Sequence, residues 1–232
     1  MNLTCVSCPV RDSAACSVLN DEERDALASV GRTRTLRRGE MLFAAGDDDA
    51  ACATLVTGAL KITATDRDGN EQILALVHPS GFIGEMFVPF AHHDVVALTN
   101  SQLCVFAQKD MQRAIEEYPA LARALLRRSQ EDLHATRSLL ELTAHGSAES
   151  RLAALLCDFA QAASDSPCHP AKEFELPLTR GEMANMLGLT IETVSRKLGE
   201  LEDAGAIRRI GKRGIEFLDH GYLLALSGKD ED

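Results

Sequence analysis

The chain has 232 residues, 45% of them hydrophobic and 25% charged, which suits a globular protein of one or two domains. It contains no run of 18 apolar residues, and its N-terminus has neither a basic start nor an apolar stretch, so we expect no membrane span and no signal peptide. The sequence therefore predicts a cytoplasmic protein without membrane contacts. The net charge of −11 would repel nucleic acid from an even surface, so any DNA-binding role requires a local face.

Seven cysteines need an explanation, because disulfide frameworks are rare in cytoplasmic proteins. Three of them, Cys5, Cys8 and Cys16, fall within the first 20 residues, and Cys104 lies in the apolar run Ser101–Phe106. The remaining three are interpreted as structural: Cys52, Cys157 and Cys168.

A short helix is predicted from Asn20, which can cap it, to about Val30. Residues 33–108 then read as short β-strands separated by recurring glycines, and Asp68-Gly69 is a hairpin turn signal. Many short strands at this spacing predict a barrel or roll.

Residues 109–143 contain no glycine and one proline, Pro119, and are predicted to be helical. Every seventh residue from 126 to 140 is leucine, and small or polar residues form a second row from 122 to 143, which together make an a/d seam typical of helix pairing. The alternative is a helix packed on its own domain. We favour a weak, switchable dimer seam of Leu126, Ser129, Leu133, Thr136 and Leu140.

A second domain is expected after Gly146, where Ser147 can cap an amphipathic helix. Further on, Thr179 and Glu182 form a capping box, Gly188 provides a turn, and Thr190 can cap a second helix that runs to about residue 203. This is a helix-turn-helix, and residues 205–217 follow as two strands with a basic tip, a wing.

The second helix of this motif has two chemically different faces. One is predicted to be buried and comprises Ile191, Val194, Leu198 and Leu201. The other points outward with Glu192, Ser195 and Arg196, residue types that can read base edges from the N-terminal part of a recognition helix. Residues expected to contact phosphates are Thr179, Arg180, Thr190, Thr193, Lys197, Lys212 and Arg213, with Arg208 and Arg209 as further candidates.

Charge supports this interpretation. Residues 177–217 carry seven Lys/Arg against six Asp/Glu, a net of +1, so the rest of the chain carries −12. The alternative is a winged helix used for protein contacts, without sequence-specific DNA binding.

In this order, a β-roll, a long helix and a winged helix resemble the CRP/FNR superfamily of bacterial transcription regulators. The pattern of Glu192, Ser195 and Arg196 is similar to that of the FNR branch, which reads a TTGAT-like palindrome as a homodimer and acts with RNA polymerase. The resemblance implies an α+β fold: a cysteine-rich cluster-binding segment (1–20), a cyclic-nucleotide-binding-like β-roll sensor domain (21–108), a dimerisation helix (109–145) and a winged-helix DNA-binding domain (146–232).

The FNR branch holds a 4Fe–4S cluster with an N-terminal cysteine triplet and one distant cysteine. The resemblance therefore implies the ligands Cys5, Cys8, Cys16 and Cys104. Cyclic AMP is disfavoured, because Asp94 stands about where relatives that bind it carry a phosphate-binding arginine. His92 and His93 are interpreted as loop residues, since adjacent side chains on a strand rarely point at one centre.

The leading hypothesis is a regulator that senses oxygen through a cluster that controls dimerisation and DNA binding, with nitric oxide as a second candidate signal. The alternatives keep the DNA-binding frame but respond to thiol redox state, haem-bound nitric oxide or a small ligand, or carry a structural zinc. No nucleophile–base pair or phosphate-cradling glycine loop is present, so an enzyme is not expected.

Overall fold

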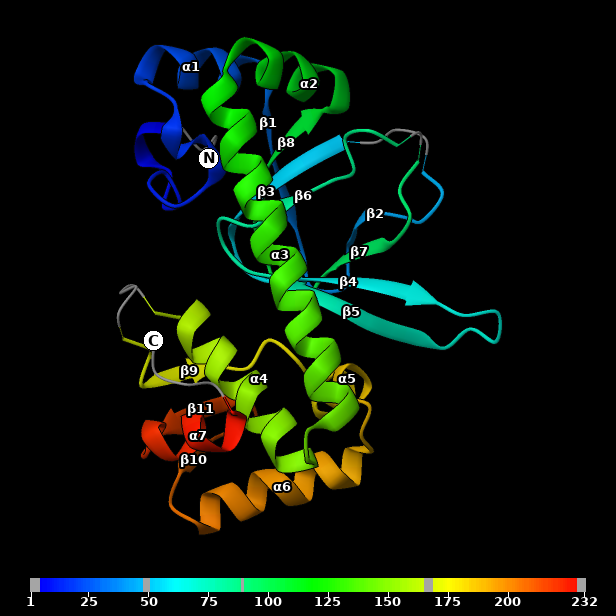
Figure 1. The fold of residues 1–232 in the computed structure, drawn as a ribbon, viewed down its shortest axis with the longest axis vertical. Helices are drawn as coiled ribbons and strands as arrows, with labels where there is room; N and C mark the ends of the chain where they lie inside the picture. Colours follow the sequence, from blue (N-terminus) through cyan, green and yellow to red (C-terminus); the bar gives the residue numbers. More distant parts are fainter. Residues whose placement is uncertain (1–4, 48–50, 89, 165–168, 229–232) are drawn as a thin grey trace. The chain divides into compact units, whose positions relative to one another are not determined.

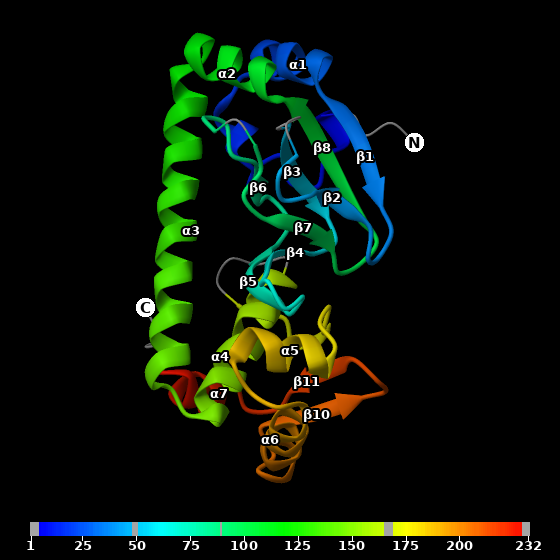
Figure 2. The same cartoon turned by 90° about the vertical axis from the view of Figure 1, so that its right-hand side faces the viewer.

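The computed structural model describes residues 5–47, 51–88, 90–164 and 169–228. The chain divides into two compact units, residues 1–136 and 137–232, which we treat separately. The helix α3 (Pro119–His145) is continuous across this division (Figures 1 and 2). In the described part of the chain, no helix is both long enough and apolar enough to span a membrane.

The first unit is built on two four-stranded antiparallel sheets, as the strand and turn pattern predicted (Figure 2). One sheet has the order β1 (Arg32–Leu36), β8 (Ser101–Ala107), β3 (Ala51–Thr57) and β6 (Phe82–Ile83). The other has the order β2 (Met41–Phe43), β7 (Asp94–Ala97), β4 (Leu60–Thr65) and β5 (Glu71–Val77).

Alternating side chains of both sheets form one apolar core. Leu55, Leu60 and Leu103 are fully buried in it, which is what a period-2 pattern produces when two sheets face each other. The β4–β5 hairpin turns at Asp66–Asn70, where Gly69 has a φ of +83°, so the turn predicted at Asp68-Gly69 is confirmed.

Short helices cover one end of this roll. Two 3₁₀ turns, η1 (Cys5–Ser7) and η2 (Ala15–Val18), precede α1 (Asp21–Val30). As predicted, Asn20 caps α1: its side chain accepts from the backbone N–H of Glu23, whose carboxylate accepts from the N–H of Asn20.

The helical stretch expected from residue 109 to 145 is two helices, α2 (Gln108–Glu117) and α3. Between them Tyr118 has a φ of −117° and a ψ of 85°, outside the helical region. The cause is Pro119, whose ring disfavours a helical conformation of the preceding residue and which has no N–H to continue the α2 ladder. The long helix therefore begins at Pro119 and not at residue 109.

The helix α3 has one face that packs in the first unit and one that does not. Leu121 and Leu125 are buried in a cluster with α1, α2 and β8. By contrast, the heptad leucines Leu126, Leu133 and Leu140 are 63%, 48% and 68% exposed. The leucine row is therefore not part of the core of a single chain.

The second unit contains, after α3, the helix α4 (Ala148–Ala162) with Ser147 as its N-cap. It continues with β9 (Glu173–Glu175), α5 (Arg180–Leu187), α6 (Ile191–Asp203), β10 (Ile207–Ile210), β11 (Gly214–Phe217) and α7 (His220–Ser227). The apolar face of α4 is buried as expected, and Cys157 is buried with it. Cys168 lies outside the described residues.

Candidate DNA-binding surface and cysteine cavity

The helix-turn-helix is formed by α5 and α6, with the caps that the sequence predicted. Thr179 and Glu182 make a reciprocal capping box on α5, and Thr190 accepts from the N–H of Thr193 at the start of α6. Gly188 ends α5 with a φ of +62°, a left-handed conformation that costs glycine little and a side-chain-bearing residue more. The turn also receives support from α4, where Arg151 Nη1 donates to the Leu187 carbonyl at 3.0 Å.

Three of the four apolar residues predicted for the inner face of α6 are buried: Val194, Leu198 and Leu201. The fourth, Ile191, is 52% exposed, so this prediction is wrong. Ile191 is the first residue of the helix, and its side chain reaches only the edge of α5 beside Gly181. A helix end has neighbours on fewer sides than the middle, and the periodicity alone does not show this.

The predicted base-reading residues lie on the accessible side of α6. Glu192 and Arg196 are exposed, and Ser195 is half-buried. Hydrogen bonds from its own backbone N–H and from the Thr190 hydroxyl lower the pKa of Glu192, so this side chain is a carboxylate that can only accept. The Arg196 guanidinium lies 3.2 Å from the Glu200 carboxylate. DNA would have to compete with Glu200 for this guanidinium.

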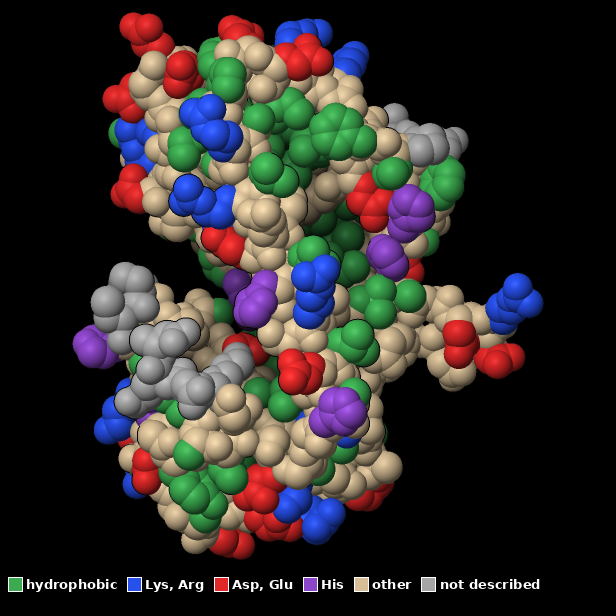
Figure 3. Space-filling model, viewed as in Figure 1, with side chains coloured by type: hydrophobic (Ala, Val, Ile, Leu, Met, Phe, Trp, Pro, Cys, Tyr) green, Lys and Arg blue, Asp and Glu red, His purple; other side chains and the backbone are tan. Residues whose placement is uncertain are grey.

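Ion pairs occupy four of the seven basic side chains of the motif. Besides Arg196, Lys197 pairs with Glu149 and Glu200, Arg208 with Glu216, and Arg209 with Glu202. The Lys197 side chain is only 18% exposed, so its expected contact with a phosphate is not supported: its ammonium already has two carboxylate partners. In the space-filling view, blue side chains near α6 lie beside red ones (Figure 3).

The other three cations, Arg180, Lys212 and Arg213, form no ion pair with any described residue. Arg180 is the first residue of α5, and the other two lie in the turn between β10 and β11. The wing is thus present as predicted, and its tip carries two of the three cations available for phosphates.

The wing also has a third strand that the sequence analysis missed. The strand β9 pairs antiparallel with β11, with Phe174 opposite Ile215. With three residues it is too short to show an alternating pattern, so the sequence offered no signal for it.

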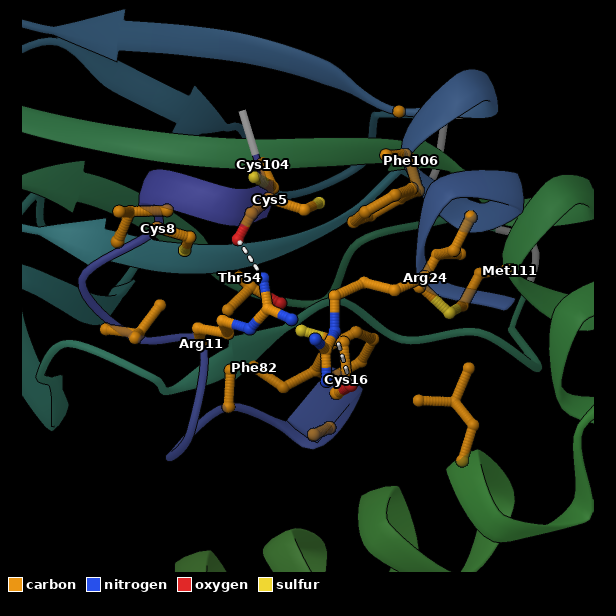
Figure 4. Close-up of a pocket in the computed structure, with 18 of the residues that line it drawn as sticks. Cys5, Cys8, Arg11, Cys16, Arg24, Thr54, Phe82, Cys104, Phe106 and Met111 are labelled. Atoms are coloured by element: carbon orange, nitrogen blue, oxygen red, sulfur yellow. Dashed lines mark hydrogen bonds between the residues drawn. The ribbon is translucent and has the colours of Figure 1, made fainter. Parts of the chain in front are cut away.

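The four cysteines implied as ligands line one cavity of about 390 Å³ in the first unit (Figure 4). Cys5 lies in η1, Cys8 follows it, and Cys16 lies in η2. Cys104 lies in the middle of β8, between Thr33 of β1 and Thr54 of β3. The fold therefore brings a thiol about 90 residues away in sequence to the N-terminal segment, where Val10 and Ala14 pack on Val56 of the sheet.

Two arginines hold the backbone of this segment in place, and sequence reasoning missed both. Arg24 of α1 is buried and donates to the carbonyls of Cys16, Ser17 and Leu19. Arg11 donates to the Cys5 carbonyl at 3.4 Å and pairs with Asp21 at 2.6 Å. Both side chains line the cavity and contribute positive charge beside the thiols (Figure 4).

Burial makes these thiols weak acids. It raises the pKa of Cys5, Cys16 and Cys104, to about 11 for Cys104, and the neighbouring thiols raise these values further. Arg24 and Arg11 act in the opposite direction on Cys5. Cys5, Cys16 and Cys104 are therefore protonated near neutral pH, and their binding to a metal centre would release protons.

Four thiols around one cavity are a donor set that suits either zinc or an iron–sulfur cluster, and the two centres need different spacings of the sulfurs. Among the described residues, no three or more His, Cys, Asp or Glu side chains are arranged so that they could hold one metal ion. A tetrahedral zinc site needs sulfurs only about 3.8 Å apart, since each Zn–S bond is about 2.3 Å. In a cubane each thiolate binds a different iron, so the sulfurs surround the cluster, as four thiols around a cavity can.

A direct hydrogen bond joins the cysteine segment to α3. Arg128 Nη2 donates to the Ser13 carbonyl at 3.0 Å, and Ser13 lies between Cys8 and Cys16. The same arginine lies 3.4 Å from Glu131. Residues 12–18 and α3 line a second hollow beside this contact, so the segment rests along the helix.

The described residues of the loop between β6 and β7 include no lysine or arginine. A cyclic phosphate would need such a cation there. Glu85 contacts His92, and its other oxygen lies 3.7 Å from His93 Nδ1. Asp94 accepts from the N–H of Ala45 at 2.7 Å. His92 and His93 lie in a loop, as expected, and Asp94 begins β7.

A winged helix-turn-helix with a Glu-x-x-Ser-Arg row on its accessible side and a basic wing tip is typical of a DNA-binding protein. Comparison with protein families agrees: residues 33–118 match the cyclic nucleotide-binding domain, and residues 150–226 match the Crp-like helix-turn-helix domain. The chain belongs to the CRP/FNR family, which is a family of transcription regulators and not of enzymes.

Individual relatives cover nearly the whole chain. The transcriptional activator protein FnrL of Cereibacter sphaeroides is 33% identical over 98% of this chain and 93% of its own length. The nitrogen fixation regulation protein FixK of Bradyrhizobium diazoefficiens is 31% identical, with coverage of 96% and 93%. The chain is thus similar to DNA-binding regulators of the FNR and FixK type.

Solved structures share the fold. FixK2 from Bradyrhizobium japonicum has a TM-score of 0.77 at 23% identity, covering 88% of this chain and 99% of that one. A CooA mutant from Carboxydothermus hydrogenoformans has a TM-score of 0.74 at 20% identity, covering 93% and 96%. At these identities the likeness supports the fold alone.

Proposed function

We propose that this chain is an oxygen-responsive transcription regulator that binds a TTGAT-like palindrome as a homodimer and acts with RNA polymerase. Its sensor is a 4Fe–4S cluster bound by Cys5, Cys8, Cys16 and Cys104. The observation that carries the proposal is that these four thiols, three from the N-terminal segment and one from β8, line one cavity. The names of the relatives FnrL and "Fumarate and nitrate reduction regulatory protein" are in keeping with it.

When bound, the cluster supplies a redox-sensitive cross-link between the N-terminal segment and β8. Arg11 and Arg24 donate to carbonyls of the segment, and their positive charge favours the thiolate form of Cys5 and, for Arg24, of Cys16. Arg128 then ties the same segment to α3. A change in the conformation of the cysteine segment can therefore reach α3 through this direct hydrogen bond.

Pairing of two α3 helices along Leu126, Leu133 and Leu140 would bury leucines that a single chain leaves exposed. Two recognition helices are then available for the two halves of a palindrome. Glu192, Ser195 and Arg196 read base edges, while Arg180, Lys212 and Arg213 contact phosphates, with Thr179, Thr190 and Thr193 at the helix N-termini. A segment that loosens on oxidation lowers the stability of the paired form and so releases the DNA.

The test is purification without oxygen, followed by measurement of iron, sulfide and the visible spectrum before and after air. We expect about four iron and four sulfide per chain, with absorption that air bleaches. Cys104→Ser is expected to lose the iron, the sulfide and anaerobic binding to the palindrome. Cys157→Ser is the matched control, because Cys157 is buried in α4 in the other unit, and it should behave as the wild type.

Two outcomes would contradict the proposal. If Cys104→Ser kept its iron or bound its site tightly without it, the ligand assignment would be wrong. Zinc without sulfide, or no metal in the anaerobic wild type, would instead favour a structural zinc or a thiol sensor in the same DNA-binding frame.

A further inference from the structure

The flanks of the α3 seam carry a pair of opposite charges. With Leu126, Leu133 and Leu140 at heptad position a, the residues beside the seam are those at e and g. The g positions hold Leu125, Asp132 and Leu139, and the e positions hold Arg123, Gln130, Arg137 and Ala144.

In a parallel pair of helices, a residue at g lies beside the e residue of the following heptad on the other helix, five positions further along. Asp132 and Arg137 are five residues apart, and they are of opposite charge. Along residues 119–145 this is the single g-to-e combination in which both residues are charged. By the two-fold symmetry of a homodimer it occurs twice.

The side chains of Asp132 and Arg137 remain available for contacts with a second chain. Asp132 and Arg137 form no ion pair and no side-chain hydrogen bond with any described residue. Arg128, one turn earlier, attracts the Asp132 carboxylate, but its guanidinium donates to the Ser13 carbonyl and lies 3.4 Å from Glu131. Both residues are exposed beside leucines that are themselves exposed.

We infer that Asp132 pairs with Arg137 of the partner subunit, and that this reciprocal pair sets the parallel orientation and register of two α3 helices. An antiparallel pairing brings g beside g and e beside e, which would remove both attractions. The small and polar side chains at heptad position d do little to fix which residues of the two helices face each other. The two ion pairs at the edge of the seam therefore contribute much of the preference for one register. The inference rests on the proposed dimer seam and not on the cluster.

The test is a charge swap in full-length protein, followed by sedimentation velocity of each variant alone and of an equimolar mixture. The homodimer of Asp132→Arg has two arginines side by side at each of the two contacts, and the homodimer of Arg137→Asp has two aspartates there. We expect each homodimer to dissociate roughly tenfold or more readily than the wild type. In the mixed dimer, one chain carries arginine at both positions and the other carries aspartate at both, so each contact joins an arginine to an aspartate. We therefore expect the equimolar mixture to form mixed dimers about as tightly as the wild type forms its homodimer, and a mixture that dimerised no better than either variant alone would contradict the inference.

The double variant, with Asp132→Arg and Arg137→Asp in one chain, restores the attraction within a homodimer. Each contact of its homodimer again joins an arginine and an aspartate, with the two positions exchanged. We expect this homodimer to form about as tightly as the wild type. Such recovery also shows that the two substitutions leave the chain folded, because a merely misfolded variant would not be rescued by a second change.

Glu141→Arg and Arg127→Asp form the control pair, since both sites are at heptad position b, away from the seam. Neither change, alone or combined, should alter dimerisation. A double variant of Asp132 and Arg137 that dimerised no better than the two single variants would overturn the inference, as would a wild type that stays monomeric at every concentration. Running the series with and without bound iron separates these outcomes from failure of the cluster proposal, which would leave the rescue intact.

Discussion

Arg196 combines exposure on α6 with the fork of donors that matches the edge of a guanine. Replacing it with alanine is expected to cost about 1–3 kcal/mol of discrimination at the guanine of the half-site. The Glu200 pair that is lost at the same time is exposed and contributes little. The measurement is a binding titration against the palindrome and against a copy with that base pair replaced.

Arg209→Ala is a suitable control for Arg196, because its side chain pairs with Glu202 and lies outside α6. It should leave the preference for guanine unchanged. An Arg196→Ala protein that still distinguished the two DNA sites as the wild type does would show that another residue reads this base.

At the scale of residues, the sequence predicted the caps and the turn glycines, because these depend on neighbours within four positions. Asn20, Ser147, Thr179 and Thr190 all cap as expected. The partners of charged side chains were not predictable in the same way. Lys197 meets Glu149, which is 48 residues away, and only the packing of α4 against α6 brings them together.

Two leucines of α3 allow a matched test of the seam. Leu133 is 48% exposed and Leu121 is 1% exposed in the single chain. We expect Leu133→Ala to leave the thermal unfolding of the monomer almost unchanged but to weaken the dimer by about 2 kcal/mol, since two leucines are shortened per dimer. Leu121→Ala is expected to lower the stability of the fold itself by about 2–5 kcal/mol.

Sedimentation velocity and thermal unfolding of both variants check this prediction. The seam would be misplaced on the helix if Leu133→Ala unfolded at a lower temperature and yet dimerised as well as the wild type.

At the scale of elements, the sequence predicted the helices and strands whose apolar residues repeat at a regular spacing. The rows of α3 and α6 and the strands of the roll follow the apolar pattern of the sequence. The division between α2 and α3 did not follow it, because Pro119 fits equally well at the start of a helix and at a break. For β9, the pairing with β11 defines the strand, and such pairing is a tertiary contact.

For the whole molecule, the cations available for phosphates predict the salt dependence of DNA binding. Three per subunit, Arg180, Lys212 and Arg213, give six in a dimer, so the logarithm of the binding constant should fall with the logarithm of salt concentration with a slope of about −5. Lys212→Ala is expected to make this slope about 2 less steep, because two phosphate contacts are lost, and to weaken binding to all sequences alike.

Titrations at several salt concentrations provide the measurement. Arg208→Ala is the control, since Arg208 is paired with Glu216 at 2.7 Å and should barely alter the slope. A slope unaffected by Lys212→Ala would remove the tip of the wing from the DNA interface.

The exposed leucine row of α3 has a consequence for how such a regulator would respond in a cell. A pairing held by two narrow rows of side chains obeys mass action, so at low occupancy the amount of dimer grows with the square of the amount of protein. A cell that makes more of the chain would then keep part of it on DNA even when the sensor weakens each dimer. The threshold of the response is therefore set jointly by the signal and by the copy number of the protein.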